Sequence, residues 1–224
     1  MLRRALLAFA ASLVGGACVP VYIAPVANVP LLSGRGEFQV AAYSGTNGLD
    51  LQGAVAVAEH VGIVADISNN RRTDSNDFHT YGELGAGYFG RIGQLGRVEL
   101  YGGAGAGESA AETTWLGETI RAQGMYYRGF GQANIGLTTD IVDVGFCARV
   151  AYVGYTFDQR SGDGPTSASE LFIEPVGFFR VGYRWVKLGV QAGLTIPVLG
   201  EELTVDTFPL LVTMGLHTRF NGLE

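Results

Sequence analysis

The residues of this sequence best suited to acid–base chemistry are its three histidines, His60, His79 and His217. His79 has two acidic neighbours, Asp74 and Asp77, in one polar stretch. A histidine oriented by carboxylates can activate water for hydrolysis, but such a site here would need further carboxylates from other loops. Asp158 and Asp163 are the obvious candidates. Short acidic loops are usually only hydrated, so we predict no catalytic residue and keep a surface hydrolase at His79 as an alternative.

No cofactor or metal site is predicted either. No two histidines are spaced so that they would converge on one metal ion. The glycine run 102–107 has the composition of a phosphate-binding loop, but no helical pattern follows it. Glycine there is better explained by room for bulky neighbours or by strand curvature. The net charge of −6 and the lack of a basic cluster argue against nucleic acid as a partner.

The elements that must position these residues are strands. Between 186 and 198 the even positions are apolar and most odd positions are polar or glycine, and residues 208–217 repeat the pattern. A period of two indicates a β-strand with one apolar and one polar face. Each run reaches the ~9–11 residues that a tilted strand needs to cross a bilayer. The sequence therefore predicts an all-β fold, a single closed antiparallel up-and-down transmembrane barrel.

The strand count follows from similar runs along the chain. We predict about ten strands, with eight as the alternative, over 36–44, 48–58, 60–68, 78–90, 96–107, 125–138, 141–157, 169–183, 185–198 and 206–220. Long polar connections (69–77, 108–124, 158–168, 199–205) alternate with short ones near 59, 91–95, 139–140 and 184. Outer-membrane barrels show this asymmetry, with long loops outside and short turns in the periplasm. An even strand count then predicts that both termini are periplasmic.

The polar faces hold a sparse mixture of charges of both signs, whereas the apolar faces are nearly free of charge. Only 16% of the residues are charged, and Lys187 is the single lysine, which is unusual for a water-exposed surface. We therefore expect lipid on the apolar side and a narrow lumen on the polar side, where acids and arginines must pair. The predicted lumen charge network is Glu83, Glu99, Arg128, Arg149, Glu174 and Arg180.

Bulky residues are expected to fill this lumen, because a barrel of this size has no wide bore. Those predicted to point inward are Tyr43, Tyr81, Phe89, Tyr101 and Phe178. Cys147 is expected to be a lone thiol in the interior. Aromatic girdles are predicted at the two membrane interfaces, with Tyr183 and Trp185 beside the shortest turn and Tyr152, Tyr155 and Phe157 near the opposite end of their strand.

The N-terminal stretch reads as an export signal. Arg3 and Arg4 precede a short apolar run, which predicts a signal peptide over 1–17. Gly15, Gly16 and Ala17 lead to Cys18, and this stretch resembles a bacterial lipobox, in which the cysteine becomes lipidated. Gly15 stands where that motif usually has leucine, and plain signal cleavage is the alternative. The proline-containing stretch 18–35 is predicted to be an extended tether, followed by the barrel over 36–220 and a tail over 221–224.

The end of the chain carries a further resemblance. Thr213, Gly215 and Phe220 are similar to the C-terminal strand signal by which outer-membrane barrels are recognised for assembly, although Thr218 replaces the usual hydrophobic residue and four residues follow the aromatic one. The layout after Gly36 is similar to small outer-membrane barrel proteins of Gram-negative bacteria, some with lipoprotein-type leaders. This resemblance implies an outer-membrane location, with membrane lipid and the barrel-assembly machinery as partners.

Two further functions stay open beside the one that we favour. We expect a non-enzymatic outer-membrane barrel with a structural or surface-interaction role. The first alternative is a lipid-tethered, lipocalin-like periplasmic carrier whose apolar face would surround a ligand. The second is the surface hydrolase described above. The sequence identifies no ligand, oligomeric state or physiological role.

Overall fold

The computed structural model describes residues 22–71, 77–115, 118–160, 166–199 and 207–220, which form strands and their connections. Among them, no helix is long and apolar enough to span a bilayer. The strands are β1 (Tyr22–Ile23), β2 (Phe38–Gly45), β3 (Gly48–Ala58), β4 (Val61–Arg71), β5 (Phe78–Ile92), β6 (Gly96–Trp115), β7 (Glu118–Thr138), β8 (Val142–Arg160), β9 (Ser167–Tyr183), β10 (Val186–Leu194), β11 (Ile196–Leu199), β12 (Thr207–Phe208) and β13 (Leu210–Phe220).

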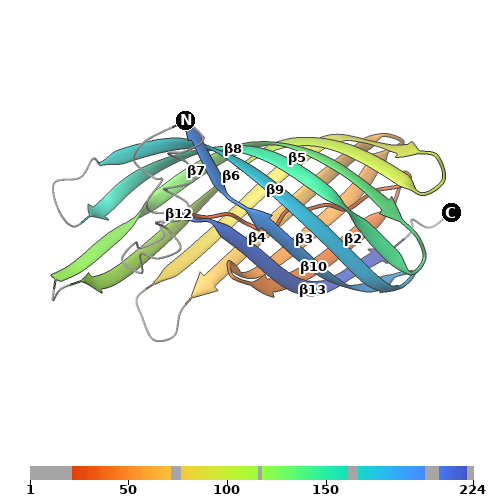
Figure 1. Ribbon diagram of the computed structural model, residues 1–224. Helices are drawn as coiled ribbons and strands as arrows, with labels where there is room; N and C mark the ends of the chain where they lie inside the picture. The colour runs from red at the N-terminus through yellow and green to blue at the C-terminus, as the bar shows by residue number, and fades with distance from the viewer. Residues whose placement is uncertain (1–21, 72–76, 116–117, 161–165, 200–206, 221–224) are drawn as a thin grey trace.

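The main sheet closes on itself into a barrel (Figure 1). Each strand from β2 to β9 pairs antiparallel with the next, β10 pairs with both β9 and β13, and β13 returns to β2. β10 and β11 are successive parts of one strand, so the barrel has ten strands in up-and-down order. This confirms the predicted all-β fold, its closure into an up-and-down antiparallel barrel and the larger of the two strand counts, whereas membrane crossing stays a prediction.

The strand positions agree closely with those predicted, with one correction. The stretch 108–124 was expected to be a long polar connection. Instead β6 and β7 continue through it as a paired hairpin, with Glu108 opposite Met125 and Thr113 opposite Ile120. Polar and small residues concealed the pairing, because a hairpin that extends beyond the barrel wall does not need an apolar face. The β-branched residues in it are nevertheless good strand formers.

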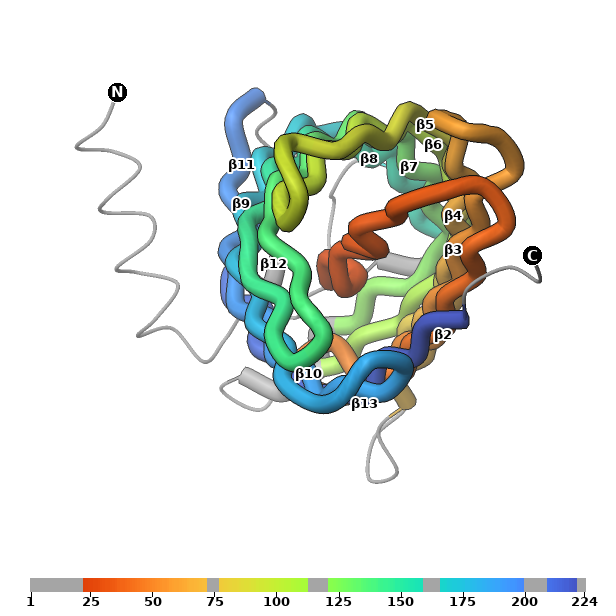
Figure 2. The backbone as a smooth tube through the Cα atoms, turned by 90° about the vertical axis from the view of Figure 1, so that its right-hand side faces the viewer, coloured from red at the N-terminus to blue at the C-terminus, as the bar shows by residue number. Residues whose placement is uncertain are grey.

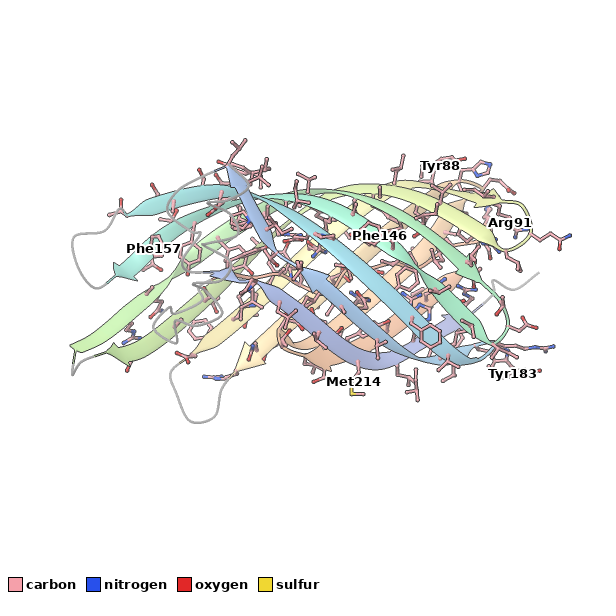
Figure 3. The ribbon with its side chains drawn as sticks, viewed as in Figure 1. Tyr88, Arg91, Phe146, Phe157, Tyr183 and Met214 are labelled. Atoms are coloured by element: carbon pink, nitrogen blue, oxygen red, sulfur yellow. The ribbon has the colours of Figure 1, made fainter. Side chains whose placement is uncertain are left out.

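The two faces of the sheet point as predicted. Side chains alternate between buried and exposed along β10, with Leu188 outward (66% exposed) and Lys187 inward (3%). On β13, Met214 is outward (67%) and Thr213 inward. Figure 3 shows Met214, Phe146 and Tyr183 on the outside of the wall. The apolar face is therefore the outer surface, opposite to what a carrier with an apolar interior requires.

Two of the five aromatic residues predicted to lie in the interfacial girdles, both on β8, point into the barrel instead. Tyr152 is exposed on the outer surface, and Tyr183 and Trp185 project at the shortest turn. Tyr155 and Phe157, however, are buried inside the barrel. They have the same parity along the strand as the inward-facing Arg149, so the period of two, and not their aromatic character, decides where they point.

The barrel has two unlike ends. The turns β3–β4, β5–β6, β7–β8 and β9–β10 lie at one end, and the ends of the longer connections lie at the other (Figure 1). β13 runs toward the short-turn end, where the described chain stops at Phe220. Tyr22, the first described residue, lies at the opposite end, because β1 pairs in parallel with β12 ahead of β13. Phe38 and Phe220, the first and last residues of the barrel, pair at the short-turn end, as an even strand count predicts, whereas Tyr22 lies at the opposite end. The two termini of the chain lie outside the described residues.

Candidate functional site: the lumen and its threaded segment

Residues 22–35, hereafter the luminal segment, run through the inside of the barrel from the long-connection end to the short-turn end. Figure 2, a view along the barrel, shows the red start of the described chain inside the ring of strands. Tyr22 and every residue from 24 to 32 are buried. The chain then reverses at Gly36, which has a positive φ of 82°, and enters β2. Glycine suits this reversal because it adopts that conformation without steric cost.

The described part of the predicted tether thus has a place of its own in the fold. Its extended backbone was expected, but its location inside the wall was not. In water the segment would expose Val26, Val29, Leu31 and Leu32, each of which is buried here. Burial of such a side chain contributes roughly 1.5–3 kcal/mol. Enclosure in the lumen removes this surface from water and also fills a bore that would otherwise stand open.

The backbone of the luminal segment is recognised by side chains of the barrel. The carbonyl oxygens of residues 25–30 each accept a hydrogen bond, and the six donors stand on six different strands. The pairs are Arg149 to Pro25 (2.7 Å), Gln52 to Val26 (2.9 Å), Gln191 to Ala27 (3.0 Å), Gln132 to Asn28 (2.7 Å), Arg180 to Val29 (2.6 Å) and Arg219 to Pro30 (3.4 Å).

Two N–H groups of the luminal segment also donate to carboxylates of the barrel wall. Val26 donates to Asp50 (3.4 Å) and Leu32 to Glu99 (2.8 Å). Pro25 and Pro30 have no N–H to satisfy, which suits a single extended chain that has no neighbouring strand on either side. The hydrogen bonds made by the carbonyl groups, together with these two, favour the burial of a non-regular chain over this length.

One side chain of the segment adds a specific contact near its middle. The Asn28 amide donates to Asp66 Oδ1 (2.8 Å) and to the carbonyl of Gly53 (3.0 Å). Both acceptors belong to the barrel wall, one on β4 and one on β3. Asn28 therefore fixes the register of the segment along the lumen.

The upper lumen, toward the long connections, contains a compact ion network. Arg128 pairs with Glu83 and with Glu174 (2.9 Å), and Arg149 pairs with Glu174 (2.6 Å) and Glu83 (3.8 Å). The side chains of all four residues are at most 2% exposed. Two arginines and two glutamates balance in charge. Such a set is stable in a low-dielectric interior only while every member keeps its partners.

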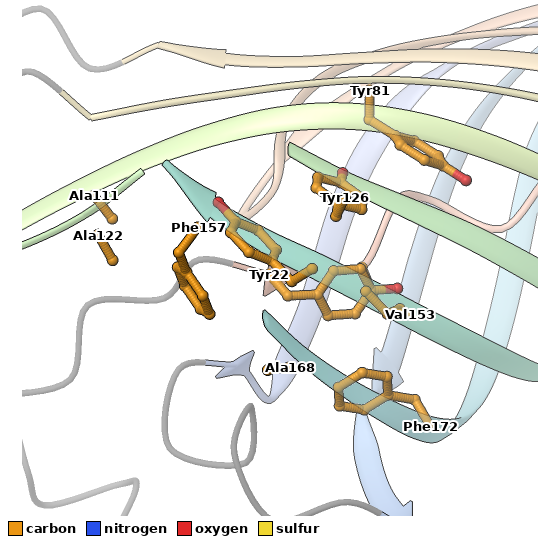
Figure 4. Close-up of a cluster of buried hydrophobic side chains, with 11 residues drawn as sticks. Tyr22, Tyr81, Ala111, Ala122, Tyr126, Val153, Phe157, Ala168 and Phe172 are labelled. Atoms are coloured by element: carbon orange, nitrogen blue, oxygen red, sulfur yellow. The ribbon is translucent and has the colours of Figure 1, made fainter. Parts of the chain in front are cut away.

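Tyr22 joins the luminal segment to this network. Its hydroxyl donates to Glu174 Oε1 (2.9 Å) and accepts from Arg128 Nε (3.0 Å). Its ring stacks on Phe172, with centroids 4.9 Å apart, and meets Tyr126 edge-on at 5.9 Å. Figure 4 shows Tyr22 within this buried group, between Tyr126 and Phe172. The first described residue of the segment is therefore its main side-chain anchor.

The six residues of the predicted charge network divide into two sets. Glu83, Arg128, Arg149 and Glu174 come together as described. Glu99 and Arg180 have no ion-pair partner among the described residues and instead bind the luminal segment. Glu99 also accepts from Asn134 (2.9 Å), and Arg180 also donates to the Tyr43 hydroxyl (3.3 Å). Where the sequence led us to expect an ion-pair partner, Glu99 accepts from the N–H of Leu32 and Arg180 donates to the carbonyl of Val29.

Nearer the short-turn end, two further ion pairs line the lumen. Lys187, the single lysine of the chain, pairs with Asp143 (2.7 Å) and donates to the carbonyl of Thr139 (2.6 Å). Arg219 pairs with Glu37 (3.1 Å). These contacts surround the point where the luminal segment leaves the barrel and turns into β2.

The residues considered for hydrolysis do not form an exposed group. His79 lies at the long-connection end of β5 as expected, but it is buried, stacked on Tyr126 and hydrogen-bonded to the Tyr126 hydroxyl (2.6 Å). Asp77 accepts from the backbone N–H of Glu112 (2.7 Å). Asp74 and Asp163 lie outside the described residues, as do Cys18, the predicted signal peptide and the tail.

Other predicted positions have clear places in the wall. Tyr43, Tyr81, Phe89, Tyr101 and Phe178 are buried inside as predicted, and Cys147 is a free, fully buried thiol. A Cβ on Gly103 or Gly105 would meet inward-pointing rings of Phe130 or Tyr81, so these glycines make room for lumen side chains. Thr213, Gly215 and Phe220 lie on β13, where Phe220 stacks on Phe38 of β2 across the closing pair of strands.

The role of the inward-facing amides was missed from the sequence, although a signal was present. Gln52, Gln132 and Gln191 stand at inward positions where an ion network would have needed charges. Ala54 and Ala56 also point inward on β3, so this part of the wall is thin. Inward amide donors beside small inward side chains indicate a lumen with room for a polypeptide backbone that accepts hydrogen bonds.

Comparison with known proteins adds no relative. No family model, no curated protein and no solved structure matches this chain.

Proposed function

We propose that this protein is an integral barrel of a bacterial outer membrane, with a structural or surface-interaction role, closed by its own luminal segment. The observation that carries the proposal is the inverted distribution of polarity: the wall exposes apolar side chains and buries its ions. Every strand of the closed ring contributes exposed apolar residues, among them Val40, Leu51, Ile67, Leu84, Leu100, Ile135, Phe146, Phe179, Leu188 and Met214.

The dimensions of this apolar surface fit a bilayer. The outward apolar positions of β10 and β11 extend from Val186 to Val198. At 3.3 Å per residue and a tilt near 40°, this length covers about 30 Å, comparable with the apolar band of outer-membrane barrels. Exposed charged residues, such as Arg91 and Arg184 at one end and Arg71 at the other, lie where headgroups and water would be.

The threaded lumen favours a structural or interaction role over general diffusion. The luminal segment occupies the bore, and no catalytic group is evident around it. We propose a non-enzymatic protein whose contacts with other molecules involve membrane lipid, the barrel-assembly machinery at β13 and the connections that leave the membrane.

The threaded path also predicts an orientation for the chain. With the long connections outside, Tyr22 lies at the outer end and Phe220 at the periplasmic end. Cys18 precedes Tyr22 by four residues, a reach of at most about 14 Å. A lipid on Cys18 would therefore attach near the outer mouth rather than in the periplasm.

Membrane fractionation with two epitopes tests the proposal. One epitope is inserted after Pro20 and the other is added after Glu224. We expect the protein in the outer-membrane fraction, with faster gel migration when it is not boiled. On intact cells we expect antibody to reach the first epitope, and to reach the second only after permeabilisation. A protein that is water-soluble without Cys18 would refute the membrane assignment, whereas the reverse labelling pattern would refute only the orientation.

A further inference from the structure

We propose that the lumen is a binding site for an extended polypeptide, recognised through its main-chain carbonyl groups, and that it accepts such a peptide when the peptide is not covalently joined to the barrel. The luminal segment would then be the resident ligand of this site. The proposal does not depend on a membrane location, because a folded barrel in detergent is enough to test it.

The first argument concerns what the barrel contacts. Six consecutive carbonyl groups, those of residues 25–30, are each met by a donor from a different strand. Every peptide residue carries a carbonyl group, so these contacts recognise an extended backbone of almost any sequence. The side chains within this stretch, apart from Asn28, are small aliphatic groups or proline rings, which make no polar contact of their own.

The second argument concerns preference among peptides. Six barrel side chains donate to carbonyl groups of residues 25–30, whereas in the described part of the chain one side chain, that of Asp50, accepts from an N–H group within the same stretch. A lumen so rich in donors favours a peptide with few N–H groups, and proline is the residue that lacks one. Pro25 and Pro30 satisfy this condition in the resident segment. The expected ligand class is therefore a proline-containing extended peptide.

The third argument is that the lumen has unused hydrogen-bonding capacity. Arg180 Nη1 and Gln191 Oε1 are buried and have no hydrogen-bond partner in the described structure. Both side chains are 1% exposed and already hold the segment through another atom. Unpartnered buried polar atoms are rare in folded proteins. These two are available to a ligand whose backbone or side chains differ from those of residues 25–30.

The fourth argument separates the anchors from the rest of the site. Tyr22 and Asn28 are the two side chains of the resident segment that bind the ion network and Asp66. A competing peptide that keeps a tyrosine and an asparagine six residues apart should hold the same register. The residues between them can vary, provided that they are small.

The test uses a barrel that lacks residues 1–35, refolded in detergent, and a fluorescent peptide with the sequence of residues 22–35. We expect saturable one-to-one binding, measured by fluorescence anisotropy. The triple variant Gln52→Leu, Gln132→Leu and Gln191→Leu should bind on the order of a hundredfold more weakly, at about fivefold for each lost hydrogen bond. Gln123→Leu is the matched control, because it makes the same exchange on β7 at a glutamine toward the tip of the β6–β7 hairpin, where its amide oxygen accepts from Arg121 (3.1 Å); it should bind as the parent does.

Two peptides test the mode of recognition. One exchanges the order of Val26, Ala27 and Val29 and keeps the remaining residues, and it should bind within a few-fold of the original. The other carries Tyr22→Ala and Asn28→Ala and should bind much more weakly. Failure of the first peptide to bind would overturn main-chain recognition. Absence of saturable binding to a barrel that shows heat-dependent gel mobility would overturn the site itself.

A cleavable full-length chain covers the case in which the truncated barrel does not fold. A specific protease site is inserted between Arg35 and Gly36, both exposed at the short-turn end, and the chain is cut after folding. We expect the cut segment to remain bound through gel filtration and to exchange with excess labelled peptide after mild warming. Release of the segment with no rebinding of the peptide would overturn the proposal, as would a segment that never exchanges below the unfolding temperature.

Discussion

The outer and inner faces of the barrel wall share one hydrogen-bonded ladder but follow opposite chemical rules. On the outer face, neighbouring apolar residues such as Leu188 and Met214 make few specific contacts and need only be apolar. On the inner face, large side chains make specific polar or ring contacts. Arg128, for example, contacts Glu83, Glu174 and Tyr22. The outer face thus depends on residue class, whereas the inner face depends on residue identity. Substitutions on the two faces should differ accordingly.

The largest expected effect comes from breaking the ion network. Glu174→Ala removes one of the two carboxylates that Arg128 and Arg149 share, and with it the acceptor of the Tyr22 hydroxyl. We expect the free energy of unfolding to fall by about 3–5 kcal/mol, measured by denaturant titration of the folded barrel. Glu174→Gln keeps the volume and an acceptor oxygen and should lose less. A loss below about 1 kcal/mol for Glu174→Ala would mean that the stability of the inner face does not depend on the identity of this residue.

A charge on the outer face should produce the next largest effect. Val190 lies near the middle of β10 and is exposed. Val190→Arg should disfavour insertion by about 2–4 kcal/mol, seen as a smaller heat-shifted fraction in refolding into liposomes. Val190→Leu stays apolar and should insert normally. Equal insertion of the arginine and leucine variants would show that this face does not meet lipid.

A smaller loss is expected where a single bond to the luminal segment is removed. Gln132→Leu deprives the carbonyl of Asn28 of its donor. Because a buried acceptor is then left unsatisfied, the free energy of unfolding should fall by about 1–3 kcal/mol. Ile135→Val, on the outer face of the same strand, should change it by less than about 0.5 kcal/mol. An equal effect of the two variants on the free energy of unfolding would contradict the claim that the inner face is the more sensitive to substitution.

The smallest effect is expected at a charge outside the lumen. Arg184 and Asp140 form an exposed pair at 3.9 Å between the short turns. Arg184→Ala should alter the unfolding free energy by no more than about 1 kcal/mol, measured under the same denaturant conditions. A loss as large as that of Glu174→Ala would show that exposed and enclosed charges contribute alike.

The wall could be predicted from the sequence because it follows local rules. A period of two, turn positions and connection lengths depend only on residues near one another in the chain. They located β3 over 48–58 and assigned the faces of β10 and β13. The hairpin at the end of β6 and β7 was missed because its polar residues give no such period.

The contents of the lumen could not be predicted in the same way. The placement of Pro25 beside Arg149, 124 residues away, depends on how all ten strands surround one space. The segment itself has no periodic pattern, since it is covered on every side and needs no polar face. Glu99 and Arg180 were expected to pair with charges because nothing local distinguishes a carboxylate from a backbone carbonyl as the partner of a guanidinium group.

The path of residues 22–35 has a topological consequence for how the protein is made. The chain enters a closed ring at one mouth and is joined to that ring beyond the other mouth, so it resembles a thread through its own bead. Either the last pair of strands closes around a segment that is already in place, or the N-terminal end of the chain must pass through a barrel that has already closed. Any group wider than the bore, once attached ahead of Tyr22, would act as a stopper that prevents the thread from being withdrawn while the ring remains intact.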